Sequence, residues 1–245
     1  MSSTAVADFG LIGLAVMGQN LILNINDHGF KVCAYNRTVS KVDDFLANEA
    51  KGTQVIGAHS IEDFVAKLKR PRKIMMLVKA GDAVDKFIET LLPHLEEGDI
   101  IIDGGNSHYP DTQRRYEYLT SKKILFVGCG VSGGEEGARY GPSLMPGGNP
   151  EAWPHLKPIF QAIAARAPDG AACCDWVGEG GAGHFVYHIF RDGVGFTDDE
   201  QGDIFAQWNK GVLDSFLIEI STDILRFKDT DGQPLLEKIR DAAGQ

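Results

Sequence analysis

The chain has 245 residues, 43% of them hydrophobic, and its 24 basic and 34 acidic side chains give a formal net charge of −10. This acidic balance argues against a nucleic-acid binder, which needs clustered Lys and Arg, and no apolar run approaches the roughly eighteen residues of a membrane span. The first residues show no secretory signal and the four cysteines are irregularly spaced, so we expect a globular cytoplasmic protein without a disulfide scaffold.

Short apolar runs alternate with helix-period segments through the first part of the chain. We predict strands at residues 8–12, 31–35, 73–78, 99–103 and 124–127, and helices at 17–27, 39–50 and 83–95. This alternation is typical of a parallel sheet covered by helices on both faces. The sequence therefore predicts an α/β fold, with a doubly wound Rossmann-type domain over residues 1–180.

The character of the chain changes from about Ala152. A helical pattern covers residues 153–165, a small apolar strand is expected at 173–177, and the chain beyond is first Gly-rich and then helical. We expect a helical remnant over residues 181–245. Its segment 212–220 is strongly apolar for an exposed helix, and it either faces a partner or packs on the first domain.

A glycine-rich turn follows the first predicted strand and opens the first predicted helix. Its residues are Gly13, Leu14, Ala15, Val16, Met17 and Gly18. The spacing is a G-x-A-x-x-G variant of the dinucleotide fingerprint, in which the first glycine permits the tight turn and the last permits close helix–strand packing. The amides at the helix N-terminus would then bind the pyrophosphate.

The end of the second predicted strand distinguishes NAD from NADP. An NAD enzyme places Asp or Glu about twenty residues after the glycine turn, whereas this chain has Asn36, Arg37 and Thr38 there. A guanidinium fork suits a 2′-phosphate. We therefore predict NADP as the cofactor, the alternative being an ordinary solvated Arg37.

Three further segments follow predicted strand ends, where open α/β sheets bind ligands. They are residues 78–81, 103–107 and 130–138, and the last two are rich in glycine. Because the carboxyl ends of parallel strands lie at one edge of a sheet, we expect these three segments to form one site.

Taken together, these motifs resemble those of the family of 6-phosphogluconate dehydrogenase, decarboxylating. The motifs that carry the resemblance are GLAVMG, YNRT, LVKAG, IIDGGNS, FVGCGVSGGEEGARYGPSLMPGG and GAGHFV, in this order. They cover residues 8 to 186 continuously, and the resemblance resumes through WNKGVLDSFLIEI to the final DAAGQ. The related β-hydroxyacid dehydrogenases share only the shorter motifs.

The resemblance implies an NADP-dependent oxidation of 6-phosphogluconate followed by loss of carbon dioxide, which gives ribulose 5-phosphate in the pentose phosphate pathway. It also implies a homodimer. Residues 13–18 would hold the pyrophosphate, and residues 36–38 the 2′-phosphate. The remaining implied contacts are Val78, Lys79, Ala80 and Asn106 for the cofactor, and Asn106, Ser132, Gly133 and Gly134 for the substrate.

The chain departs from the family after Val186. There the family continues with K-M-V-H-N-G-I-E-Y-G-D, which carries the lysine general base and the glutamate general acid, whereas this chain continues with Tyr187 and His188. Roughly eighteen residues are missing, or about five helical turns, so the helix stays in phase, with an apolar stripe of Phe185, Val186, Ile189 and Phe190. The sequence thus offers no family catalytic residue.

The family also continues, beyond the segment where this chain ends, into a large helical domain that supplies substrate-binding cations and most of the dimer interface. Residues 181–245 correspond to the start of that domain. We therefore expect the 212–220 segment to lack its neighbours and to favour poor solubility or non-native association.

Four neighbouring side chains are candidate substitutes for the missing groups. His184 and His188 are spaced for one helix face and suit acid–base or metal chemistry, but no third ligand is evident and hydrogen-bonded histidines are the favoured interpretation. Tyr187 occupies the sequence position of the lysine, although a phenol is a poor base at neutral pH. Nothing in the sequence argues for Cys129 as a nucleophile, and we expect no metal.

Three hypotheses follow. The chain is a working 6-phosphogluconate dehydrogenase, a catalytically impaired form that binds NADP, or another β-hydroxyacid oxidoreductase with improvised acid–base groups. The second is favoured for this chain, because each lost proton-transfer group contributes about 10²–10⁴ in rate. This second hypothesis includes a non-catalytic NADP-binding remnant, a splice product or a gene-model fragment.

Overall fold

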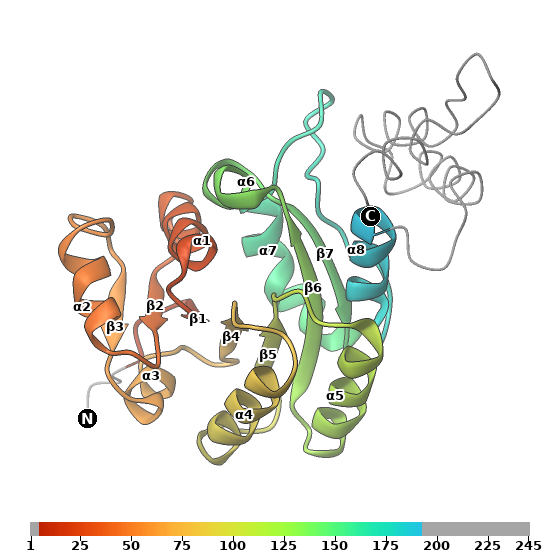
Figure 1. Cartoon of the computed structure of the whole chain (residues 1–245), viewed down its shortest axis with the longest axis horizontal. Coiled ribbons are helices and arrows are strands. Elements are labelled where there is room, and N and C mark those ends of the chain that lie inside the picture. Colours follow the sequence, from red (N-terminus) through yellow and green to blue (C-terminus); the bar gives the residue numbers. More distant parts are fainter. Residues whose placement is uncertain (1–4, 193–245) are drawn as a thin grey trace, which may run out of the picture.

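The computed structural model describes residues 5–192, which form a seven-stranded sheet with helices on both faces (Figure 1). The strands are β1 (Phe9–Ile12), β2 (Val32–Tyr35), β3 (Ile56–Ala58), β4 (Lys73–Met76), β5 (Ile100–Asp103), β6 (Leu125–Ser132) and β7 (Ser143–Gly148). The helices are α1 (Val16–Asp27), α2 (Ser40–Ala47), α3 (Ile61–Ala66), α4 (Asp82–Leu91), α5 (Tyr109–Ser121), α6 (Gly134–Tyr140), α7 (Trp153–Ile163) and α8 (Ala182–Asp192), with short 3₁₀ helices η1 (Leu92–His94) and η2 (Pro150–Ala152).

The strand order is β3-β2-β1-β4-β5-β6-β7. All neighbours pair in parallel except β6 and β7, which are antiparallel. The chain runs outward from β1 to β3 and then crosses back to β4, so the order reverses between β1 and β4. Open α/β sheets bind ligands at such a switch point. The predicted doubly wound Rossmann-type sheet is confirmed, with β7 as an antiparallel addition.

Both faces of the sheet are buried, which explains why the strands are continuous apolar runs. Helices α1, α2 and α7 pack on one face, where Leu21, Phe45 and Phe160 join a common core. Helices α3, α4 and α5 pack on the other. Successive strand residues alternate between the two cores, as the pleat requires: Met75 belongs to the first, and its neighbours Ile74 and Met76 to the second.

Helix α8 lies against β6 and β7, beside α5 (Figure 1). Glycines permit this approach. A Cβ atom on Gly183 would lie 2.0 Å from the carbonyl oxygen of Gly128, and one on Gly130 would lie 2.4 Å from the Cβ atom of Tyr187. The first turns of α8 therefore rest directly on the sheet, and Tyr187 is held in a fixed place.

Three sequence expectations need correction. Residues 173–177 do not form a strand: they make isolated contacts with β7, such as the bridge between Leu144 and Cys174. The strand predicted at 124–127 extends into the Gly-rich segment 130–138, because β6 continues to Ser132 and α6 begins at Gly134. The apolar stripe of α8 is also wrong in part, since Val186 and Ile189 are buried but Phe185 is 37% exposed and packs against Tyr109.

The predicted apolar segment 212–220 lies outside the described residues, so its association stays a prediction. Within residues 5–192, no helix is long and apolar enough to cross a membrane.

Candidate cofactor-binding site

The glycine turn joins β1 to α1 at the switch point of the sheet. Gly13 has a φ of 112°, and a Cβ atom there would lie 2.3 Å from the carbonyl oxygen of Leu77, just beyond β4. A Cβ atom on Gly18 would lie 1.9 Å from the carbonyl oxygen of Gly13. Both glycines are thus required by close backbone contacts, in the two roles that the fingerprint predicts.

The N-terminus of α1 has no side-chain cap. Ala15 occupies the N-cap position without a capping hydrogen bond, and Val16 in the first turn is 48% exposed. Leu14 is buried and Met17 half-buried, so these residues contribute backbone rather than side chains to the turn. The amides of an uncapped helix start carry a partial positive charge and can bind a phosphate.

The segment after β2 is tied to the glycine turn through Asn36. The Leu14 amide donates a hydrogen bond to Asn36 Oδ1 at 3.1 Å, and Asn36 Nδ2 donates to the carbonyl of Thr38 at 3.1 Å. The Arg37 and Thr38 side chains are exposed beside this link. Asn36 therefore orients the segment, and within residues 5–192 Arg37 forms no ion pair.

The segments after β4 and β5 flank the same edge. Val78 and Ala80 are half-buried, Lys79 is exposed, and Gly81 leads into α4 with a φ of 89°. Asn106 is exposed in the segment after β5. Because β4 and β5 are parallel neighbours, these segments lie side by side, as the sequence predicts.

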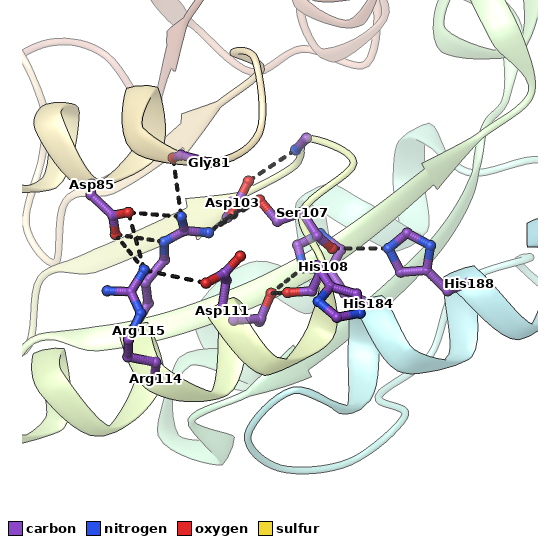
Figure 2. Close-up of polar contacts among 12 residues, drawn as sticks. Gly81, Asp85, Asp103, Ser107, His108, Asp111, Arg114, Arg115, His184 and His188 are labelled. Carbon is purple, nitrogen blue, oxygen red and sulfur yellow. Dashed lines mark hydrogen bonds and ion pairs between the residues drawn. The ribbon is translucent and has the colours of Figure 1, made fainter. Parts of the chain in front are cut away.

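A buried polar network connects these two segments (Figure 2). Its centre is Arg115 on α5, whose side chain is 1% exposed. The guanidinium donates hydrogen bonds to the Asp85 carboxylate, to the Gly81 carbonyl and to Ser107 Oγ, and it pairs with Asp103. Ser107 Oγ in turn donates to Asp103 Oδ2 at 2.6 Å.

Sequence reasoning missed Arg115 and Asp85. In the sequence, residues 109–121 form a polar helix pattern in which Arg115 resembles its exposed neighbour Arg114. The usable signal was the Asp103 carboxylate at the end of a buried strand, which calls for a cationic or hydrogen-bonding partner.

Hydrogen bonds from Arg115, with a further contribution from Arg114, lower the pKa of Asp85 to about 2, against the opposing effect of burial. A pKa below the ordinary 3.8 means that this carboxylate stabilises the fold fully above about pH 4 and loses that contribution as the pH falls toward 2. Asp85 is 34% exposed, so solvent screening limits the effect to about 1 kcal/mol.

Replacing Asp85 by Asn is therefore expected to lower the free energy of unfolding by about 1 kcal/mol at neutral pH, and by progressively less between pH 4 and 2. Urea unfolding at a series of pH values measures the difference. Glu97→Gln is the control, because Glu97 pairs with Lys123 and both are 70% exposed. A deficit in the Asp85 variant that stays constant down to pH 2 contradicts the assignment.

Helix α8 contributes two polar side chains to the segment after β5. The Tyr187 hydroxyl donates to Asn106 Oδ1 at 3.1 Å, and His188 Nε2 donates to the Ser107 carbonyl at 3.0 Å. The residue in the sequence position of the family lysine thus contacts the residue that the resemblance assigns to both cofactor and substrate. No sequence signal paired these residues, which are 81 positions apart.

His184 is completely buried, next to Thr112 of α5 and Gly128 of β6. Its Nδ1 atom forms a 2.7 Å hydrogen bond with Thr112 Oγ1, and Nε2 has no hydrogen-bond partner among the described residues. Burial lowers the pKa of His184, so the ring is neutral at neutral pH. Its hydrogen bond agrees with the structural interpretation favoured from the sequence.

Three of the predicted substrate contacts lie at the junction of β6 and α6. Ser132, Gly133 and Gly134 are exposed at the end of β6 and the start of α6. Burial raises the pKa of the Cys129 thiol far above its ordinary value, which disfavours a thiolate. Within residues 5–192, no group of three or more His, Cys, Asp or Glu side chains is arranged to hold a metal ion.

Two protein-family models match this chain. The family model described as "NAD binding domain of 6-phosphogluconate dehydrogenase" matches residues 8–178. A second, "6-phosphogluconate dehydrogenase, C-terminal domain", matches residues 184–245.

Curated relatives named 6-phosphogluconate dehydrogenase, decarboxylating, are similar throughout. The protein of Cunninghamella elegans is 72% identical over 98% of this chain and 53% of its own length. That of Schizosaccharomyces pombe is 64% identical over the whole chain and 54% of its own length. The chain thus spans about half the length of these curated relatives. The second alignment runs over 263 positions for a chain of 245 residues, so about 18 positions have no residue here.

Solved structures of similar fold include a member of the same family. A Plasmodium falciparum 6-phosphogluconate dehydrogenase, described in apo form and in complexes with NADP+ and with 6-phosphogluconate, has a TM-score of 0.70 and 39% identity over 96% of this chain and 54% of its own. A Mycobacterium tuberculosis 3-hydroxyisobutyrate dehydrogenase has a TM-score of 0.64 at 18% identity over 97% of this chain and 71% of its own, which shows a shared fold alone. On the matched domain and these identities, the chain belongs to the family of 6-phosphogluconate dehydrogenase, decarboxylating.

Proposed function

We propose that this chain binds NADP and is impaired in the oxidative decarboxylation of 6-phosphogluconate. The observation that carries the proposal is the glycine turn at the switch point, where the uncapped start of α1 lies beside the segment that contains Arg37. A pyrophosphate on the α1 amides would place the adenosine ribose toward β2, which is next to β1. A 2′-phosphate on that ribose would then meet Arg37.

The substrate side of the proposal rests on Asn106, Ser132, Gly133 and Gly134. Asn106 follows β5, Ser132 ends β6, and the two glycines come directly after it. The carboxyl ends of these two parallel neighbours lie at the same edge as the glycine turn. Amides and hydroxyls at such an edge suit a polyhydroxy acid anion. The substrate that the family implies is 6-phosphogluconate, and the homodimer that it implies is likewise a proposal for this chain.

The impairment is proposed from α8. In this family, GAGHFV leads into the lysine that removes the substrate hydroxyl proton and the glutamate that serves as general acid. In this chain Val186 is followed by Tyr187, whose hydroxyl donates to Asn106, and by His188, which donates to the Ser107 carbonyl. NADP, when bound, would accept a hydride. The α8 sequence contains no lysine or glutamate to move the accompanying protons, and its one carboxylate is Asp192, the last residue of the helix.

For the division of the chain, we propose an NADP-binding domain at residues 1–180 and the start of a helical domain at 181–245. Within the described part, the first turns of α8 pack on β6 and β7, so the two units meet at the sheet.

Arg37→Ser tests the cofactor assignment. Removing a charge-assisted interaction worth about 1.5–3 kcal/mol is expected to weaken NADP binding by about 10- to 100-fold, while weak NAD binding stays unchanged. Titration calorimetry with both dinucleotides measures this. Lys51→Ser, an exposed change after α2, is the control. The assignment fails if wild type and Arg37→Ser bind NADP equally well.

A further inference from the structure

Arg115 joins two segments of the proposed site through one guanidinium group (Figure 2). On one side, Nε donates to Asp85 Oδ1 at 2.8 Å, and Nη2 donates to Asp85 Oδ2 at 3.1 Å and to the Gly81 carbonyl at 3.1 Å. On the other, Nη1 donates to Ser107 Oγ at 3.2 Å and lies 3.4 Å from Asp103 Oδ2. The planar fork of arginine suits such divergent acceptors.

The two sides belong to different ligand-binding segments. Gly81 ends the segment of Val78, Lys79 and Ala80, and Ser107 adjoins Asn106. Asp103 holds its own segment as well, because its Oδ1 accepts from the Gly105 amide at 3.1 Å. The Arg115 side chain therefore sets the distance between the segment after β4 and the segment after β5.

Stability alone does not call for this arrangement. Burying a guanidinium and the fully buried carboxylate of Asp103 carries a desolvation cost, and well-packed apolar groups often serve a core equally well. What an apolar core cannot do is fix the relative position of two loops through directed hydrogen bonds at both ends.

The strand order indicates which part of the cofactor meets these loops. With the pyrophosphate on α1 and the 2′-phosphate toward β2, the other half of the dinucleotide extends across β1 toward β4 and β5. That half carries the nicotinamide.

We propose that Arg115 is a positioning residue, which holds residues 78–81 against residues 103–107 so that both segments contact the nicotinamide half of NADP together. This inference rests on the proposed function. The adenosine half would lie on the glycine turn and Arg37, and none of the Arg115 hydrogen bonds described above involves those residues. The two halves of the cofactor should therefore respond differently when Arg115 is changed.

The test compares NADP with adenosine 2′,5′-bisphosphate, which represents the adenosine half alone. Arg115→Met is expected to weaken NADP binding by about tenfold or more and to leave the affinity for adenosine 2′,5′-bisphosphate within about twofold. Arg115→Lys keeps the charge but lacks the fork, so it should restore little of the NADP affinity. Both ligands are titrated into the full 245-residue chain by calorimetry.

Arg114→Met is the matched control. Arg114 is the neighbouring residue on α5 and contacts the same Asp85, but it is 56% exposed and, within residues 5–192, its other ion-pair partner is Asp111. This variant should bind both ligands as the wild type does. Ser107→Ala is a second test in case Arg115→Met does not fold, because it removes the Ser107 link to the segment after β5 and keeps the Asp85 and Asp103 pairs. It should also weaken NADP selectively.

The outcomes separate the two proposals. Equal loss of both ligands in the Arg115 and Ser107 variants, or full retention of both, overturns the positioning role while NADP binding by the wild type stands. A wild-type chain that binds neither ligand overturns the proposed function itself, and this inference with it.

Discussion

The 245-residue chain, mixed with NADP and 6-phosphogluconate, is expected to form no NADPH above a heat-treated control. The reaction of this family needs a base for the substrate hydroxyl and an acid after decarboxylation, and each such group contributes about 10²–10⁴ in rate. Loss of both removes about 10⁴–10⁸, which takes an ordinary turnover below detection. In the described part of α8, GAGHFV is followed by Tyr187, in the sequence position of the lysine, and then by His188.

The measurement is NADPH absorbance with time, and two controls make a negative result informative. A full-length relative, such as the Saccharomyces cerevisiae protein that is 66% identical to this chain, shows that the assay works. NADP binding by this chain shows that its first domain is folded.

A rate of order 1–10³ per second would contradict the proposed impairment. Tyr187 would then be the first residue to replace, because its hydroxyl reaches Asn106. His188 would follow, since it reaches the adjacent Ser107 carbonyl. His184 is the weakest candidate, because it is buried against Thr112.

Much of the fold could be predicted because its strands are buried on both faces. In β5, Ile100 and Ile102 face one core and Ile101 faces the other, so the run is apolar at successive positions. Helix patterns separate such runs in the sequence. The strands that were missed lack that signal. β3 has only the three residues Ile56–Ala58, and β7, at Ser143–Gly148, contains Pro146 and two glycines. Both lie at sheet edges, where pairing depends on a neighbour already in place.

The loops of the candidate site were predictable for a related reason. Parallel strands place their carboxyl ends together, so the glycine turn and the segments after β4 and β5 had to meet. The side-chain links between these loops were not predictable. Whether Arg115 faces solvent like Arg114, or a buried carboxylate, depends on how α5 sits against α4. The contact of Tyr187 with Asn106 likewise depends on where α8 rests on the sheet.

The position of α8 also explains how a family fold can be kept where family chemistry is proposed to be lost. Contacts that seat the start of the helix come from Gly183, His184 and Val186, which lie within GAGHFV, and Tyr187 adds a contact with Gly130. The contacts within GAGHFV precede the departure from the family. The residues that would do the chemistry come after it, so they can change while the contacts of Gly183, His184 and Val186 hold the first turns in place.

Gly18→Ala is expected to have the largest effect of a single methyl group on NADP binding. The new Cβ atom would lie 1.9 Å from the Gly13 carbonyl oxygen, which is backbone and cannot rotate away, so the turn must shift. A shift that costs two charge-assisted bonds between amides and pyrophosphate removes about 3 kcal/mol or more, or at least about 100-fold in affinity. Overpacking should also lower the free energy of unfolding by about 1–3 kcal/mol.

Gly137→Ala provides the matched control, because it makes the same change at another helical glycine. There the nearest atom to the new Cβ is the Ser132 carbonyl oxygen at 3.5 Å, an ordinary contact. Alanine also favours a helix over glycine by up to about 1 kcal/mol. This variant should bind NADP like the wild type and unfold at the same or a higher urea concentration. Wild-type NADP affinity in Gly18→Ala would mean that the dinucleotide is not held by this turn.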